Sequence, residues 1–213
     1  MAFHAALLAG VSASAAAAQT ITIAALGDSL TQGYGLPPEA GLVPQLDRWL
    51  AERGQDVALI NAGVSGDTTA GGLARIEWTL TDEVDALILA LGGNDLLRGV
   101  DPAAVRANLD ATLAIAVARD LPVLLVGSAA PDNYGPDYKA AFDSLFAELA
   151  DKHGALFHDN LLAPLLVIED RAAARRTYMQ ADGLHPNAEG VALIVAHLGP
   201  AVEALIARAR SGD

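Results

Sequence analysis

The chain has 213 residues, of which 53% are hydrophobic and 18% charged, and its formal net charge is −13 at pH 7. This length suits one domain with a substantial core, and the acidic balance argues against nucleic acid as a partner, because phosphate backbones are bound by clustered Lys and Arg. The absence of cysteine excludes disulfides, thiolate metal ligands and a cysteine nucleophile.

Residues 1–19 differ in composition from the rest of the chain. A short apolar stretch is followed by small residues that end in Ala16-Ala17-Ala18, which is typical of an export signal with its cleavage site. No Lys or Arg precedes that stretch, so a flexible Ala-rich leader is the alternative. We expect a periplasmic or secreted protein, with the cytoplasm as the other location, and a single domain over residues 20–213. We expect no integral membrane span, because no run of about twenty consecutive apolar residues is present.

From Thr20 onward, short apolar runs alternate with longer amphipathic stretches. The short runs predict strands at 21–26, 57–61, 86–91, 122–127 and 155–158, and their nearly continuous apolar character is typical of parallel strands buried on both faces. The longer stretches predict helices at 39–53, 67–79, 102–119, 137–153 and 188 to about 208. Asn187 should cap the start of the last helix, and Gly199-Pro200 should kink or break it. Five such βα units predict an α/β protein with three α/β/α layers around a five-stranded parallel sheet.

In sheets of this kind, ligands bind beyond the carboxyl ends of the strands. The segments that follow the first four predicted strands are 27–35, 62–67, 92–99 and 128–138. Each is rich in Gly, Asn, Asp, Ser or Tyr. The sequence therefore predicts a polar site at this edge of an apolar scaffold.

A serine and a histidine segment stand out as candidates for nucleophilic catalysis. Ser29 follows Gly27 and Asp28 directly after the first strand, although Gly-Asp-Ser is also an ordinary turn with a helix cap. A serine nucleophile needs a base, and the base needs an orienting group. His185 lies three residues after Asp182 in an irregular segment, where a turn would bring the carboxylate to Nδ1 and leave Nε2 facing a serine. The other histidines lie in the leader, near a helix end, at a strand end or within a helix, where structural roles are expected: His4, His153, His158 and His197.

A tetrahedral intermediate also needs hydrogen-bond donors for its oxyanion. Asn94 follows the third predicted strand and offers a side-chain amide, while Gly66 precedes a predicted helix and offers a backbone N–H. The N–H of Ser29 is the natural third donor. Each of these features is also common in ordinary turns, so none is specific by itself.

Together, these segments resemble the four sequence blocks of the SGNH/GDSL hydrolases, in the family's order and at similar spacing. The blocks are GDSLTQG at 27–33, the segment around Gly66, GGND at 92–95 and DGLHP at 182–186. The stretches NAGVSGDTTAGG at 61–72, GGNDLLRG at 92–99 and NYG at 133–135 are similar to the periplasmic acyl-thioesterase, arylesterase and lysophospholipase subgroup. The resemblance covers the chain from about Thr20 to Ala207.

The resemblance implies the flavodoxin-like SGNH hydrolase fold and a catalytic triad. Ser29 would be the nucleophile, His185 the general base and acid, and Asp182 the orienting carboxylate. Ser29, Gly66 and Asn94 would form the oxyanion hole. The implied activity is hydrolysis of small-molecule acyl esters or thioesters through an acyl-enzyme, without a cofactor. Nothing in the sequence favours one oligomeric state over another.

Three rival classes have weaker support. The 27–35 loop contains neither the lysine of a nucleotide-binding P-loop nor a complete G-x-G-x-x-G pattern. A metal hydrolase is disfavoured because no H-E-x-x-H is present and one Asp–His pair is too few ligands for zinc, so we expect no metal. A catalytically silent binding protein would not react with a fluorophosphonate at Ser29.

Among hydrolases, the alternative is a carbohydrate O-acetylesterase on the same fold. An acetyl group needs a small polar-walled pocket, whereas a longer acyl chain needs an apolar trough. Leu96, Leu97 and Tyr134 lie on predicted active-site loops and are candidate substrate-binding residues. They favour acyl chains over acetyl groups.

Overall fold

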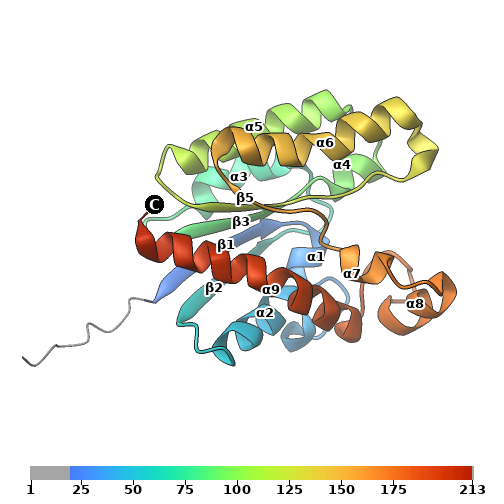
Figure 1. Ribbon diagram of the computed structural model, residues 1–213, viewed down its shortest axis with the longest axis horizontal. Coiled ribbons are helices and arrows are strands. Elements are labelled where there is room, and N and C mark those ends of the chain that lie inside the picture. Colours follow the sequence, from blue (N-terminus) through green and yellow to red (C-terminus); the bar gives the residue numbers. More distant parts are fainter. Residues whose placement is uncertain (1–19, 213) are drawn as a thin grey trace, which may run out of the picture.

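The computed structural model describes residues 20–212, so the predicted leader lies outside the described residues. A parallel sheet of five strands in the order β2-β1-β3-β4-β5 forms its centre (Figure 1). The strands are β1 (Ile21–Gly27), β2 (Val57–Gly63), β3 (Ala86–Ala90), β4 (Val123–Val126) and β5 (Leu156–His158). All five lie where the sequence predicts them.

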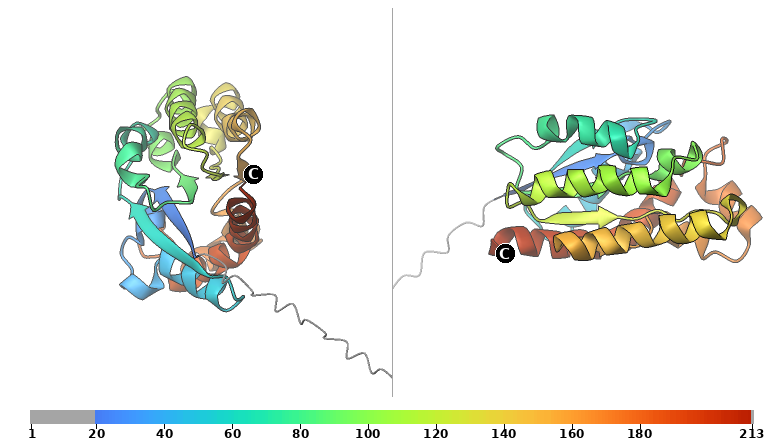
Figure 2. Two further views of the ribbon diagram at one scale, coloured as in Figure 1. Left: turned by 90° about the vertical axis from the view of Figure 1, so that its left-hand side faces the viewer. Right: turned by 90° about the horizontal axis from the view of Figure 1, so that it is seen from above.

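Helices cover both faces of the sheet. One face carries α3 (Thr69–Thr79), α5 (Pro102–Val117) and α6 (Pro136–His153), and the other carries α2 (Leu42–Ala51) and α9 (Ala188–Ser211). The left-hand view of Figure 2 shows the sheet between the two helical layers. The predicted α/β/α architecture is therefore confirmed.

The core consists of two apolar clusters, one on each face of the sheet. Alternate residues of β1 enter opposite clusters: Ala24 and Leu26 pack toward α3, α5 and α6, whereas Ile23 and Ala25 pack toward α2 and α9. This follows from the two-residue period of a strand. The central strands β1, β3 and β4 are almost completely buried.

The two edge strands differ from the prediction. β2 and β5 were expected to be buried on both faces, but both are partly exposed, and Ile60 of β2 has an exposed fraction of 37%. An edge strand has a neighbour on one side only, so solvent reaches its outer residues despite its apolar sequence.

Two helices begin later than predicted. Gly41 has an extended backbone and separates α2 from a short 3-10 turn, η1 (Pro38–Ala40). Thr68 caps α3, and its hydroxyl accepts a hydrogen bond from the Gly71 N–H at 3.3 Å. Gly41 and the Thr68 cap therefore start the two helices two to three residues later than the apolar pattern predicts.

Helix α9 is continuous through Pro200, so the predicted break is wrong. A proline in a helix interior costs about 3 kcal/mol. That cost is offset by packing, since Leu198 and Val202 are completely or almost completely buried and Gly199 lies against the Trp49 ring of α2. The predicted cap is confirmed, because the Asn187 side chain accepts hydrogen bonds from the first N–H groups of the helix.

Among the residues that the structure describes, α9 is the one helix long and apolar enough to cross a membrane. Half of its most apolar stretch is buried inside the fold. A buried core helix meets the same criteria of length and composition, so this is weak evidence for a membrane span.

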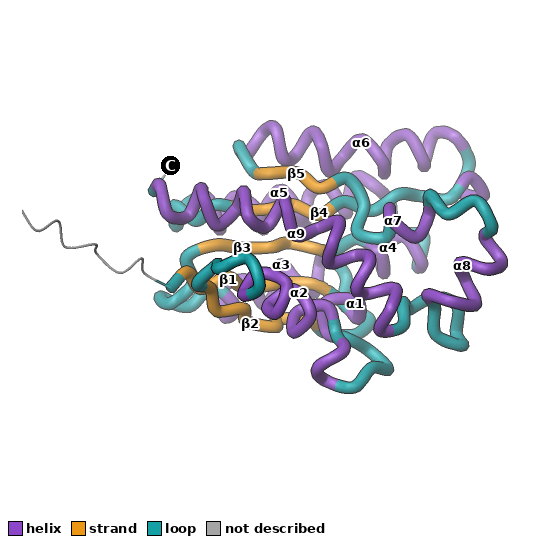
Figure 3. The backbone as a smooth tube through the Cα atoms, turned by 60° about the horizontal axis from the view of Figure 1, so that its bottom comes forward, coloured by secondary structure: helices purple, strands orange, loops and turns teal. Residues whose placement is uncertain are grey.

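Short helices gather at the carboxyl ends of the strands, as Figure 3 shows. The sequence does not predict them. They are α1 (Ser29–Gln32), α4 (Gly93–Leu97), α7 (Ala163–Leu166) and α8 (Arg171–Tyr178), with a second 3-10 turn, η2 (Asp132–Tyr134).

Candidate active site

A cleft of about 510 Å³ opens at the carboxyl edge of the sheet. Its polar side is formed by residues that the sequence singles out and by their neighbours: Asp28, Ser29, Ser65, Gly66, Asn94 and His185. They come from the loops after β1, β2 and β3 and from the segment before α9. The cleft thus lies where parallel strands end, as expected for this architecture.

Ser29 is the first residue of α1 and follows β1 after one intervening residue. That residue, Asp28, caps the helix, because its Oδ1 accepts a hydrogen bond from the Leu30 N–H at 3.0 Å. The cap fixes the turn from strand to helix and leaves the Ser29 side chain on the cleft wall. The Gly-Asp-Ser sequence is therefore both a helix cap and a cleft element.

Ser29, His185 and Asp182 form one chain of hydrogen bonds across 156 residues of sequence. The Ser29 Oγ lies 2.8 Å from His185 Nε2, and His185 Nδ1 lies 2.7 Å from Asp182 Oδ2. The other carboxylate oxygen of Asp182 accepts the backbone N–H groups of Leu184 and His185 at 2.9 and 3.0 Å. These two bonds hold the 182–185 segment in a turn that aims the imidazole at the serine.

The electrostatics of this chain define which nitrogen of His185 carries a proton. The hydrogen bond from the His185 ring, followed by the backbone N–H groups of His185 and Leu184, lowers the pKa of Asp182 to about 2. Asp182 is therefore a carboxylate at neutral pH and can only accept hydrogen bonds. Neutral His185 then carries its proton on Nδ1, which leaves Nε2 as the acceptor for the Ser29 hydroxyl.

Asn94 lies in α4 and lines the cleft beside Ser29. Its Nδ2 donates a hydrogen bond to Asp28 Oδ2 at 3.2 Å, which fixes the direction of the amide and leaves a second amide hydrogen. Burial raises the pKa of Asp28, although the Leu30 N–H and other hydrogen bonds oppose the rise. The residue before the serine thus orients the amide of Asn94.

Gly66 lies in a turn after β2 with a φ of +78°, a conformation that favours glycine. Its carbonyl accepts a hydrogen bond from Arg98 at 2.8 Å, which ties this turn to the end of α4. Among residues 20–212, neither the Gly66 N–H nor the Ser29 N–H donates a hydrogen bond within the protein. Two backbone donors and the Asn94 amide are therefore available on the wall of one cleft.

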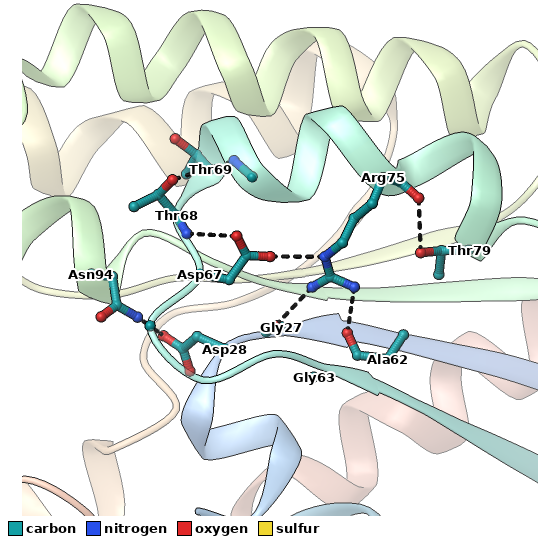
Figure 4. A network of polar contacts seen from close by, with 12 residues as sticks. Gly27, Asp28, Ala62, Gly63, Asp67, Thr68, Thr69, Arg75, Thr79 and Asn94 are labelled. Atoms are coloured by element: carbon teal, nitrogen blue, oxygen red, sulfur yellow. Dashed lines mark hydrogen bonds and ion pairs between the residues drawn. The ribbon is translucent and has the colours of Figure 1, made fainter.

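Arg75 of α3 ties together the two strand ends that carry these donors (Figure 4). Its guanidinium donates to the Gly27 carbonyl at 3.0 Å and to the Ala62 carbonyl at 2.7 Å, and it forms an ion pair with Asp67 at 2.8 Å. Gly27 precedes Asp28, and Asp67 follows Gly66. The planar guanidinium thus fixes the ends of β1 and β2 and the loop between β2 and α3 relative to one another.

A second buried contact fixes α4 against α3. Asp95 is 1% exposed and accepts hydrogen bonds from the Thr69 N–H at 2.8 Å and the Thr69 hydroxyl at 2.7 Å. Asn94 is the preceding residue, so this contact holds its backbone in place. The Gly-Asn-Asp sequence therefore contributes Gly93 and Asn94 to the cleft wall and Asp95 to its support.

The remaining wall of the cleft is mostly apolar, although Ser128 and Asn160 also line it. Leu96 and Leu97 line it, as the sequence suggests, and so do Leu161 and Leu162, which follow β5. Leu161 and Leu162 follow the fifth predicted strand, so their position after a strand end is the sequence signal that marks them.

Tyr134 lies outside the set of cleft-lining residues, and its predicted place in the substrate site is not supported. Its hydroxyl instead donates a hydrogen bond to the Leu96 carbonyl at 2.7 Å. Tyr134 therefore binds the end of α4 without lining the cleft, which gives a structural reason for a tyrosine in that loop.

One group of side chains in the described part of the chain could offer three ligands to a metal ion. His158, Asp159 and His197 have ligand atoms within 4.8 Å of one another, and the buried His158 Nε2 has no hydrogen-bond partner there. Ligand atoms of a tetrahedral zinc ion are about 3.3 Å apart, given Zn–N distances of about 2.0–2.1 Å. The exposed Asp159 and His197 would have to move inward to share an ion.

Comparison with known proteins places this arrangement in a family. Residues 25–193 match the GDSL-like lipase/acylhydrolase family. The chain is 37% identical to the esterase TesA of Pseudomonas aeruginosa, covering 90% of this chain and 91% of that protein. It is 34% identical to thioesterase 1/protease 1/lysophospholipase L1 of Escherichia coli K12, covering 90% of this chain and 87% of that protein.

A solved structure agrees with these relatives. AlinE4, described as an SGNH-hydrolase family esterase, superposes with a TM-score of 0.71 at 38% identity, over 89% of this chain and 98% of the AlinE4 chain. Both the sequence and the fold match over most of their length. The chain therefore belongs to the GDSL-like lipase/acylhydrolase family of SGNH hydrolases.

Proposed function

We propose that this protein is a serine esterase and thioesterase that hydrolyses small-molecule acyl esters through an acyl-enzyme. The observation that carries the proposal is the continuous hydrogen-bond chain from Ser29 through His185 to Asp182 at the cleft wall. One relative is named an esterase and the other thioesterase 1/protease 1/lysophospholipase L1, and both names support hydrolysis of an acyl bond.

In the proposed mechanism, Ser29 Oγ attacks the acyl carbonyl carbon while His185 Nε2 accepts the hydroxyl proton. The carbonyl oxygen becomes an oxyanion, and the carboxylate of Asp182 stabilises the imidazolium. Nε2 then returns the proton to the departing alcohol or thiol as the bond to the leaving group breaks. A water molecule attacks the acyl-enzyme by the same route, releases the carboxylic acid and restores the Ser29 hydroxyl.

We assign the oxyanion hole to the backbone N–H groups of Ser29 and Gly66 and to the side-chain amide of Asn94. Asn94→Ala should lower kcat by about 100- to 1000-fold, equivalent to roughly 2.7–4 kcal/mol, because it removes a donor aimed at developing charge. Steady-state hydrolysis of a nitrophenyl ester measures this loss. The exposed Asn133→Ala is the matched control and should keep wild-type kcat. A loss below about fivefold for Asn94→Ala would show that the backbone donors suffice.

We propose acyl chains longer than acetyl as the substrates, because seven leucines line the cleft. Apolar surface buried by each added methylene should stabilise the bound acyl group by about 0.8 kcal/mol until the wall is filled. kcat/KM for nitrophenyl acetate, butyrate, octanoate and palmitate should therefore rise beyond acetate. A sharp maximum at acetate would favour the carbohydrate O-acetylesterase alternative instead. The Ser29→Ala protein provides the background rate for each ester.

We further propose that the protein is exported to the periplasm or the exterior. The support is the sequence of residues 1–19, an apolar stretch followed by small residues with Ala at the positions a signal peptidase requires. Mass spectrometry of the N-terminus of protein purified from cells should show a start near residue 19. An intact Met1 on the active protein would contradict export by this route.

A further inference from the structure

The proposed nucleophile and its base lie on different segments of the chain, so something must hold Ser29 Oγ and His185 Nε2 at hydrogen-bond distance. Ser29 belongs to the segment 28–36 after β1, and His185 belongs to the segment 179–187 before α9. Among the hydrogen bonds of residues 20–212, two join these segments directly. One is the Ser29–His185 bond itself, and the other is made by the side chain of Gln180.

Gln180 bridges the two segments through one atom. Its Nε2 donates to the Tyr34 carbonyl at 2.8 Å and to the Pro186 carbonyl at 3.0 Å. Pro186 directly follows His185, and the Gln180 backbone N–H also binds the His185 carbonyl at 2.8 Å. Gln180 therefore binds the carbonyl groups of both His185 and Pro186.

The other end of the bridge leads to Ser29. The Ser29 carbonyl accepts the Tyr34 N–H at 3.0 Å, and the Tyr34 ring packs on the His185 ring with centroids 4.7 Å apart. Tyr34 thus contacts both members of the pair, and its backbone is fixed by Gln180. The side-chain amide of Gln180 also fits closely against Gly35, where a Cβ atom would collide with its Oε1.

We propose that Gln180 is a positioning residue that sets the distance between Ser29 Oγ and His185 Nε2. The inference rests on the proposed function, in which these two atoms exchange the proton. A misplacement of about 1 Å between reacting groups can reduce rate by about 100-fold. An amide suits this task, because its NH₂ group can donate to two carbonyls at once.

The test replaces Gln180 with methionine, which keeps the length of the side chain but cannot donate. Gln180→Met should lower kcat by about 10- to 100-fold with KM changed less than about threefold, since the cleft wall is intact. Labelling of Ser29 by a fluorophosphonate should slow by a similar factor. If Gln180 only stabilised the fold, the variant would have a lower melting temperature, and its folded form would keep wild-type kcat and KM.

Gln45 provides a matched control. Its Nε2 also bridges two carbonyls, those of Ala40 and Ala188, at 2.7 and 3.0 Å, and so reaches α9 without contacting Tyr34 or His185. Gln45→Met should keep kcat within about twofold of wild type. Equal losses of kcat in both variants would overturn the proposal, because they would indicate general loosening around α9.

A second variant approaches the bridge from the opposite loop. Gly35→Ala should displace the Gln180 amide and reproduce the loss of kcat at nearly constant KM. Because Gly35 has a φ of +74°, which alanine adopts only with strain, wild-type kcat in this variant is the decisive outcome if Gln180→Met does not fold. Wild-type kcat in a folded Gln180→Met or Gly35→Ala protein would overturn the proposal. If Ser29→Ala instead retained activity, the proposed function would fail and not the bridge alone.

Discussion

Replacement of Ser29 by alanine is expected to reduce kcat by about 10⁶-fold, as loss of the nucleophile does in serine hydrolases with a triad. In the proposed mechanism the hydroxyl oxygen forms the acyl-enzyme, and among the described residues it is the group bonded to His185 Nε2, at 2.8 Å. Steady-state hydrolysis of a nitrophenyl ester and covalent labelling by a fluorophosphonate both measure the effect. The expected result is loss of both signals together.

The Ser29→Ala protein should remain folded. The change removes one hydrogen bond on a partly exposed cleft wall, which costs about 0.5–1.5 kcal/mol of stability. Ser144→Ala on α6 removes a hydroxyl that does not line the cleft and should leave kcat unchanged. If folded Ser29→Ala kept more than about one per cent of wild-type kcat, a different nucleophile would have to be sought.

Replacement of Asp182 by asparagine is expected to reduce kcat by about 10³- to 10⁴-fold while leaving the turn intact. The asparagine carbonyl can still accept the N–H groups of Leu184 and His185, which Asp182 Oδ1 accepts now. Its NH₂ group would face His185 Nδ1, and the imidazole would then carry its proton on Nε2. That tautomer cannot accept the Ser29 proton, and the same change of carboxylate to amide in a serine protease triad lowers kcat by about 10⁴-fold. Steady-state hydrolysis of a nitrophenyl ester measures the loss.

The matched control is Asp170→Asn at the start of α8. Asp170 also accepts a backbone N–H, that of Ala173 at 2.8 Å, but it has no histidine partner among the described residues. Its replacement should leave kcat unchanged. A comparable kcat for Asp182→Asn and wild type would show that His185 does not depend on the carboxylate for its orientation.

Much of the fold follows from local patterns. Apolar runs place all five strands, and the Asn187 cap places the start of α9, because these signals lie within a few consecutive residues. The order of the strands and the partial exposure of β2 depend on which neighbour each strand finds, which no local pattern records. The path of α9 through Pro200 likewise depends on contact with α2.

The helices that the sequence does not predict lack a periodic apolar pattern. Helices α1, α4 and α7 have four or five residues, which is too short to show a period of 3.6 residues. Helix α8 is longer, but Ala174 is its one buried residue, so it has no apolar stripe. These helices form because the ends of the sheet and the caps hold them in place.

The candidate site likewise combines residues that the sequence identifies with one residue that it does not. Ser29, Gly66, Asn94, Asp182 and His185 have chemically distinctive side chains or turns, and the structure brings all but Asp182 to the wall of one cleft, with Asp182 bonded directly behind His185. Gln180 has an ordinary polar side chain, and its partners are main-chain carbonyls that could belong to any residue. Its place between the two loops is visible only in three dimensions.

The position of Ser29 and His185 at opposite ends of the described chain has a consequence for biosynthesis. The ribosome makes Ser29, the proposed nucleophile, 156 residues before His185, its proposed base, and it makes the 179–187 segment and α9 last. A nascent or truncated polypeptide that stops before His185 thus lacks the imidazole to which the Ser29 hydroxyl is bonded in the complete fold. Under the proposed mechanism, hydrolytic activity therefore arises only after the 179–187 segment has been made and has folded against Ser29.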